Sequence, residues 1–84
     1  MPNITSKHPC NILNEIKWRG LDISKCEVFY IHRGAPNDTK VVRGDEIKEI
    51  APSFFILRSG TMIPYHRIFR IMYVGKVVYE KINR

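Results

Sequence analysis

Residues 27–32, EVFYIH, followed by RGAPND at 33–38 and by KVVR at 40–43, decide the fold class of this chain. The first run is rich in β-branched and aromatic residues, which favour strands. The second combines glycine, proline, asparagine and aspartate, which is typical of a turn or loop. The third run returns along the first. We therefore expect two strands joined by a loop.

Upstream of this pair, the apolar spacing changes from that of a strand to that of a helix. Ile12, Leu13 and Ile16 fall on one helical face, and Thr5 or Ser6 can cap the helix at its start. Trp18 is expected to anchor the end of this helix on the core, with base stacking as the alternative.

Downstream, the sequence predicts a short helical turn opened by Gly44 that carries Ile47 and Ile50. Strands follow at 54–57 and 62–63, and a hairpin at 67–82 turns at 74–76. In the first arm of that hairpin, strict alternation would place Phe69, Ile71 and Tyr73 on one side. The predicted class is α+β, with one N-terminal helix packed on a bent, mostly antiparallel sheet of four to six strands and a short second helical turn.

Length and composition limit what this chain can be. Its 84 residues predict a single domain over 1–84, with a core from about residue 8 to 82, and leave no room to enclose a large cofactor. The longest apolar run, FFIL at 54–57, is far shorter than a membrane span, and MPNI at 1–4 lacks signal-peptide features. We expect a soluble, cytoplasmic protein without a membrane partner or cofactor.

The two cysteines are interpreted as reduced thiols, because they form neither a CxxC pair nor a disulfide framework. A zinc site built from His8, Cys10 and Cys26 would have poor ligand spacing, so no metal is predicted.

The positive charge is unevenly distributed. The net charge is +6, and residues 51–84 carry six basic residues against one acidic residue, which gives +5 of that total. Such an excess attracts polyanions such as nucleic acid, although it also serves solubility.

One short element occurs twice in the chain. Tyr30 precedes His32 and Arg33, and Tyr65 precedes His66 and Arg67, each time beside a glycine or proline that marks a strand end. Arginine offers a planar fork to phosphate oxygens and histidine donates hydrogen bonds, while Gly34 would let the backbone approach closely. Ordinary pairing of each arginine with an acidic residue is the alternative. Two such motifs in one basic chain favour a shared anion site.

The motifs HRGAP at 32–36, IPYHRI at 63–68 and VGKVVY at 74–79, with ILNEIKW at 12–18, resemble the small archaeal RNA cyclic-group end recognition domain. The resemblance covers about residues 11–81. It implies an RNA-binding domain that recognises RNA termini, chiefly 2′,3′-cyclic phosphate ends, in RNA repair or processing and beside the enzymes of those processes. The implied phosphate and RNA contacts are His32, Arg33, Gly34, Tyr65, His66 and Arg67.

RNA ends are single-stranded, so a flat surface for the terminal base is expected beside the phosphate site. Tyr30, Tyr65 or Phe29 can supply that surface, and their alternative is packing in the core.

An enzyme is the chief competing hypothesis, because His32 and His66 would suit the general base and general acid of a metal-independent ribonuclease or cyclic phosphodiesterase. Against it, the sequence offers no carboxylate-rich element to orient the two imidazoles. A protein-interaction module is the third hypothesis.

Overall fold

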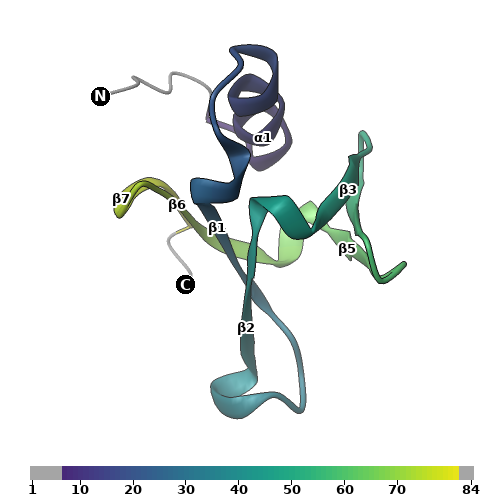
Figure 1. Cartoon of the computed structure of the whole chain (residues 1–84). Helices are drawn as coiled ribbons and strands as arrows, with labels where there is room; N and C mark the ends of the chain where they lie inside the picture. Colours follow the sequence, from purple (N-terminus) through teal and green to yellow (C-terminus); the bar gives the residue numbers. More distant parts are fainter. Residues whose placement is uncertain (1–6, 82–84) are drawn as a thin grey trace.

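The computed structural model describes residues 7–81, which form one helix and two antiparallel sheets (Figure 1). The helix α1 spans Pro9–Trp18. The four-stranded sheet has the order β2-β1-β6-β7 and the three-stranded sheet the order β3-β4-β5. The strands are β1 (Cys26–Ile31), β2 (Thr39–Arg43), β3 (Ile47–Ile50), β4 (Phe54–Leu57), β5 (Met62–Pro64), β6 (Ile68–Tyr73) and β7 (Lys76–Glu80). The predicted α+β class is confirmed, but the strands form two sheets rather than a single bent one.

The start of α1 is fixed by a proline and a side-chain cap. Pro9 occupies the first helical position, where its missing N–H costs nothing, and the backbone N–H of Cys10 donates to His8 Nδ1 at 3.2 Å. The predicted caps, Thr5 and Ser6, lie outside the described residues. With ten residues α1 is too short to cross a membrane, and no other helix of the described chain is long and apolar enough.

Trp18 does not anchor the helix on the core, so that prediction is wrong. Its side chain is 83% exposed, whereas Ile12, Leu13 and Ile16 are completely buried. Two residues along a helix correspond to a rotation of about 200°, so the residue two positions after buried Ile16 points away from the core.

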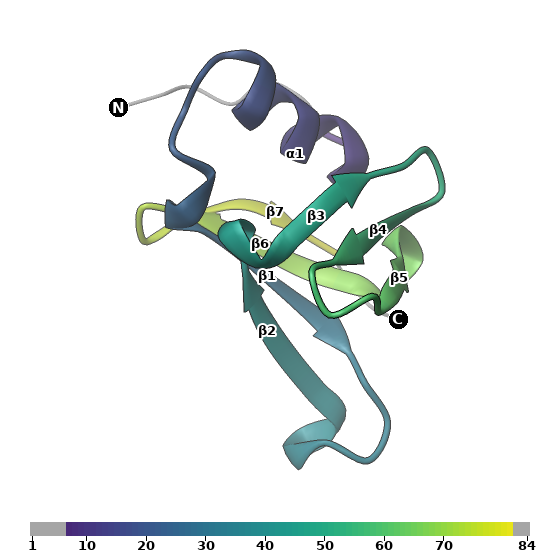
Figure 2. The same ribbon diagram turned by 45° about the vertical axis from the view of Figure 1, so that its right-hand side comes forward.

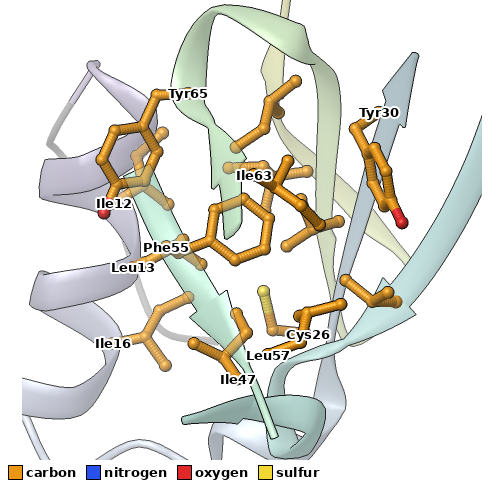
Figure 3. Close-up of a cluster of buried hydrophobic side chains, with 14 of the residues drawn as sticks. Ile12, Leu13, Ile16, Cys26, Tyr30, Ile47, Phe55, Leu57, Ile63 and Tyr65 are labelled. Atoms are coloured by element: carbon orange, nitrogen blue, oxygen red, sulfur yellow. The ribbon is translucent and has the colours of Figure 1, made fainter. Parts of the chain in front are cut away.

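The core lies between α1 and the two sheets. Phe55 is completely buried in the middle of the cluster, while Tyr65 lies beside the helix and Tyr30 on the opposite side (Figure 3). Tyr65 packs its ring against Phe55 with centroids 5.9 Å apart and against His8 at 6.1 Å. The N-terminal end of the helix and the segment before β6 are therefore joined through one aromatic side chain.

A β-bulge changes which side chains of β6 face the core. Tyr30 pairs with Ile68 and Phe29 pairs with Arg70, which leaves Phe69 without a partner on β1. As a result Ile68, Ile71 and Tyr73 are buried, and Phe69 lies on the opposite face, in contradiction to the strict alternation predicted for this arm.

The helical turn predicted after Gly44 is shorter than expected. A 3-10 turn covers only Gly44–Glu46, and Ile47–Ile50 is the strand β3, which pairs with β4. Its register shifts between Ile47 and Glu49, so a bulge at Lys48 lets both isoleucines pack inward. The same apolar spacing of three residues would occur on a helix, which explains the wrong prediction.

The hairpin of β1 and β2 extends away from the helix, and its connecting loop forms one end of the molecule (Figures 1 and 2). This loop carries Arg33 and Gly34. The other predicted motif lies in the 3-10 turn η4 (Tyr65–Arg67), between β5 and β6.

Candidate nucleic-acid interface

The two His-Arg motifs leave the four-stranded sheet at the same end. His32 and Arg33 follow β1 directly, and His66 and Arg67 precede β6 directly. Because β1 and β6 are antiparallel, with Tyr30 opposite Ile68, the chain after Tyr30 lies near the chain before Ile68. Both motifs were expected at strand ends, and the register confirms this placement.

Arg67 lies between two pockets. On one side, a pocket of about 330 Å³ is lined by His32 and Arg67 together with the strand β5 and its neighbours. On the other side, a smaller pocket of about 80 Å³ is lined by His66, Arg67 and Lys81, with Ile31, Ile68 and Phe69 as its apolar wall. Neither lining contains a carboxylate. We call His32, His66, Arg67 and Lys81 the Arg67 site.

The arginines of the described chain divide into two groups. Four of the six between residues 7 and 81 are engaged, three in ion pairs with carboxylates and one, Arg58, through Nε with the Asp45 carbonyl oxygen. Within that part of the chain, the side chains of Arg33 and Arg67 have neither an ion pair nor a hydrogen bond, and both are exposed. These are the two arginines that the repeated motif singled out. A guanidinium without a carboxylate partner keeps its donors available for a phosphate.

Lys81 is the member of the Arg67 site that sequence reasoning missed. Its Nζ donates to the backbone carbonyl of His66 at 2.9 Å, and its own backbone N–H donates to the Phe69 carbonyl at 2.9 Å. Fifteen residues separate Lys81 from His66, and Lys81 belongs to no motif. Only the pairing of β6 with β7 could have indicated this neighbour.

The loop after β1 is closed by its own hydrogen bonds. The backbone N–H of His32 donates to the Asp38 carbonyl at 2.8 Å, and the backbone N–H of Gly34 donates to the Asp38 carboxylate at 3.2 Å. The amide of Gly34 is therefore already occupied by an anion. The structure gives Gly34 a conformational role, because its φ is +95°, and close backbone approach to phosphate stays a prediction.

Arg33 lies on this loop and does not line either pocket of the Arg67 site. The structure thus brings His32, His66 and Arg67 to one region, whereas Arg33 and Gly34 belong to the projecting loop. The sequence suggested a symmetric clamp of two arginines. The geometry instead centres the site on a single arginine.

Both tyrosines of the repeated motif are buried, which removes them as stacking surfaces. Tyr65 is 5% exposed and its hydroxyl donates to the Ala51 carbonyl oxygen, while Tyr30 is 4% exposed with its ring edge-on to His32 at 6.3 Å. Burial raises the pKa of each hydroxyl above its usual value. Tyr65 positions the turn that carries His66 and Arg67, and Tyr30 supports His32.

The two histidines line different pockets on either side of Arg67. Within residues 7–81, neither the His32 nor the His66 imidazole is hydrogen-bonded to a carboxylate, and the nearby Asp38 carboxylate accepts from Gly34. A general base normally needs such an orienting partner.

The cysteines belong to no candidate metal-binding cluster within residues 7–81. Among residues 7–81 no cluster of three or more histidine, cysteine, aspartate or glutamate side chains has a geometry able to hold a metal ion. Both thiols are free; Cys10 contacts the Ala51 carbonyl oxygen at 3.6 Å, and Cys26 is completely buried. Burial raises the pKa of Cys26 to about 12.

A larger pocket of about 760 Å³ lies elsewhere, between α1 and β3, with exposed Trp18 on its wall. Its charged lining residues are Glu15, Lys17, Lys48 and Glu49, so opposite charges balance there. A neutral lining attracts phosphate less than the carboxylate-free Arg67 site does.

Fold and site together describe a small α+β domain with a basic site at one end of its four-stranded sheet. The family model of the MJ1316 RNA cyclic group end recognition domain matches residues 7–81, so the chain belongs to this family. A UPF0248 protein of Archaeoglobus fulgidus is 40% identical over 70 residues, which cover 82% of this chain and 99% of that relative. UPF0248 proteins of Methanococcus vannielii (32% identity, 86% and 89% covered) and Methanopyrus kandleri (32%, 75% and 84%) are similar. No solved structure matches significantly.

Proposed function

We propose that this protein binds RNA ends that carry a 2′,3′-cyclic phosphate and that the Arg67 site holds the terminal phosphate. The observation that carries the proposal is the exposed Arg67, which has no partner within residues 7–81 and lies between two pockets without carboxylates. The family is named for recognition of RNA cyclic-group ends, which agrees with this chemistry. RNA cleavage by a neighbouring 2′-hydroxyl leaves such an end, so the proposed ligand is a product of RNA processing.

In the proposed complex, each member of the Arg67 site has a distinct task. The Arg67 guanidinium binds the phosphate oxygens with its planar fork, and the imidazoles of His32 and His66 donate hydrogen bonds from either side. Lys81 adds positive charge while its bond to the His66 carbonyl keeps β7 against the turn. Arg33, on the projecting loop, attracts the RNA backbone at longer range.

The apolar walls of both pockets support a cyclic over a linear phosphate. Met62 and Ile63 line the larger pocket, and Ile68 and Phe69 the smaller one. A cyclic phosphate carries a single negative charge, whereas a terminal phosphomonoester carries nearly two at neutral pH. Transfer of the less charged group to a half-apolar site costs less desolvation free energy.

The test compares one fluorescent RNA oligonucleotide with three different 3′ ends: cyclic phosphate, linear phosphate and hydroxyl. Wild-type protein is expected to bind the cyclic end most tightly in fluorescence anisotropy titrations. Arg67→Ala should weaken that binding by about 1 to 3 kcal/mol, the scale of a lost charged hydrogen bond, and should reduce the preference over the hydroxyl end.

Lys48→Ala is the matched control, because it removes the same charge from an exposed side chain in the neutral pocket beside Trp18. Equal losses in the two variants would show that only net charge matters. Equal affinity of the wild type for all three ends would contradict end recognition.

Incubation with a 2′,3′-cyclic nucleotide separates binding from catalysis. We expect no linear monophosphate to accumulate. A product that disappears in His66→Ala would instead identify a cyclic phosphodiesterase.

A further inference from the structure

The four-stranded sheet buries one face in the core and leaves the other face uncovered by any element of residues 7–81. Along β1 the buried and accessible residues alternate, so Phe29 and Ile31 lie opposite the core face. Their cross-strand partners share that side: Val41 on β2 and Arg70 on β6 are both register partners of Phe29. We call the surface formed by Phe29, Ile31, Val41, Phe69, Arg70 and Met72 the open sheet face.

This surface gathers apolar side chains, with Glu27 and Glu80 on the same side of the sheet as the register partners of Met72 and Arg70. Ile31 is 40% exposed and Val41 50%, and the half-buried rings of Phe29 and Phe69 lie next to each other with centroids 6.2 Å apart. The bulge at Phe69 is what brings its ring to this side. Exposed apolar clusters of this kind mark binding surfaces.

The Arg70 guanidinium lies over both rings. Its guanidinium carbon lies 5.6 Å from the centroid of Phe29 and 5.9 Å from that of Phe69, within the range of cation–π contacts. Glu80 accepts from its Nε at 3.2 Å and from its Nη2 at 2.9 Å, which orients the plane. The side chain remains 38% exposed, so the group can present a planar surface to a ligand. Nucleobases stack on arginine planes and on aromatic rings.

The open sheet face is continuous with the Arg67 site. Ile31 and Phe69 form the apolar wall of the pocket that also contains His66, Arg67 and Lys81. Phe69 follows Arg67 by two residues, and both side chains line this same pocket. A nucleotide attached to a phosphate at Arg67 would reach this ring directly.

Such a face suits either a second copy of this chain or a nucleic-acid strand, and charge favours the nucleic acid. A second copy of this chain would bring another net charge of +6 against the first, whereas a nucleic-acid strand is a polyanion. We propose that the open sheet face binds the bases of the unpaired nucleotides next to the RNA end, stacked on Arg70 and the Phe69 ring. This inference rests on the proposed function, because it takes the terminal phosphate to be at Arg67.

The experiment measures how affinity depends on RNA length. Anisotropy titrations use oligonucleotides of about two and about eight nucleotides, all with a cyclic phosphate end, and a competition titration uses the nucleoside 2′,3′-cyclic phosphate alone. For wild-type protein the affinity should rise with length. Phe69→Leu should lower it at least about fivefold for the longer RNA, the lower bound for one lost base stack, and by a smaller factor for the mononucleotide, because leucine keeps the apolar wall of the pocket. Trp18→Leu is the matched control, because it removes an exposed aromatic ring outside this face.

Salt dependence provides a second readout. The affinity of Phe69→Leu should keep the wild-type salt dependence, since stacking releases no counterions, whereas Arg67→Ala should flatten the slope by about 0.7 per lost phosphate contact. Equal losses for mononucleotide and long RNA in Phe69→Leu, or no loss at all, would overturn the proposal. So would a dimer in sedimentation that dissociates in this variant, because the face would then bind a second copy.

The two proposals fail in different ways. If the length-dependent loss in Phe69→Leu persists while cyclic and hydroxyl ends bind equally, the stacking surface stands and end recognition falls. If the cyclic end is preferred but affinity does not depend on RNA length, end recognition stands and the stacking surface falls.

Discussion

The Tyr65 hydroxyl offers a decisive test of how the Arg67 site is built, because Tyr65→Phe removes a single oxygen from a side chain that is 5% exposed. In the sequence this tyrosine looks like an RNA contact, whereas in the structure its hydroxyl donates to the Ala51 carbonyl at 2.5 Å. These two roles predict different outcomes for the same substitution.

The magnitude follows from what the substitution leaves behind. The Ala51 carbonyl oxygen would keep only the Cys10 thiol, a weak donor at 3.6 Å. Loss of the better donor at a part-buried acceptor should lower the free energy of unfolding by about 1 to 2 kcal/mol. For a domain of this size each kcal/mol corresponds to a decrease in Tm of about 4 to 8 °C.

The assay combines urea unfolding, followed by circular dichroism, with RNA binding of the folded protein. We expect Tyr65→Phe to lower the midpoint with an unchanged m-value, and to change the affinity for cyclic-ended RNA by less than about twofold, because the hydroxyl touches no ligand. Tyr79→Phe is the matched control, because that hydroxyl has no hydrogen-bond partner within residues 7–81.

The reasoning would be refuted by the opposite pattern, unchanged stability with a large loss of affinity, which would return Tyr65 to the RNA-binding surface. A double variant with Cys10→Ala gives a further check. Because both donors share the Ala51 carbonyl, their effects should not be additive.

Three further outcomes can be checked by unfolding measurements. Gly44→Ala should lower the free energy of unfolding by more than about 2 kcal/mol, because an added Cβ would lie 2.0 Å from the Ile23 carbonyl oxygen. Gly34→Ala should cost only about 1 to 2 kcal/mol, because its Cβ would meet open space and only the φ of +95° is unfavourable. Burial raises the pKa of Cys26 to about 12, so the folded state retains a proton that the unfolded state loses above about pH 9. The free energy of unfolding should therefore fall as the pH rises through this range, by up to about 1.4 kcal/mol per pH unit. In Cys26→Ala the decrease should be less steep. Trp18→Ala should change the free energy of unfolding by less than about 0.5 kcal/mol, since its side chain is 83% exposed, and a loss of several kcal/mol would restore it to the core.

Short sequence patterns correctly predicted those elements whose structure depends on neighbouring residues in the chain. The strand at 54–57 has the predicted bounds, and the C-terminal hairpin turns where the glycine at 75 allows it. The 3-10 turn after Gly44 was predicted from its start, but its end was not, because the spacing of Ile47 and Ile50 suits a helix as well as a bulged strand.

The candidate site could be predicted only in part from the sequence. The motif identified both arginines that lack partners within residues 7–81, but it could not show that only Arg67 lines pockets. It also missed Lys81 and the open sheet face. Those depend on strand pairing between distant residues and on the bulge at Phe69, which reverses the side that a periodic pattern assigns to a residue.

The comparison of Arg67 with Arg70 explains why a charge count could not define the site. Arg67 ends the turn before β6, and Arg70 lies three positions later within β6. Arg70 is paired with Glu80 at 2.9 Å and lies over aromatic rings, while Arg67 has neither contact in the described chain. A phosphate that bound Arg70 would have to displace a carboxylate, so its favourable contribution would be offset by the broken ion pair. Arg67 carries no such cost. In the proposed complex the same type of side chain therefore has two roles, anion binding at Arg67 and base stacking at Arg70, and the Glu80 carboxylate accounts for the difference.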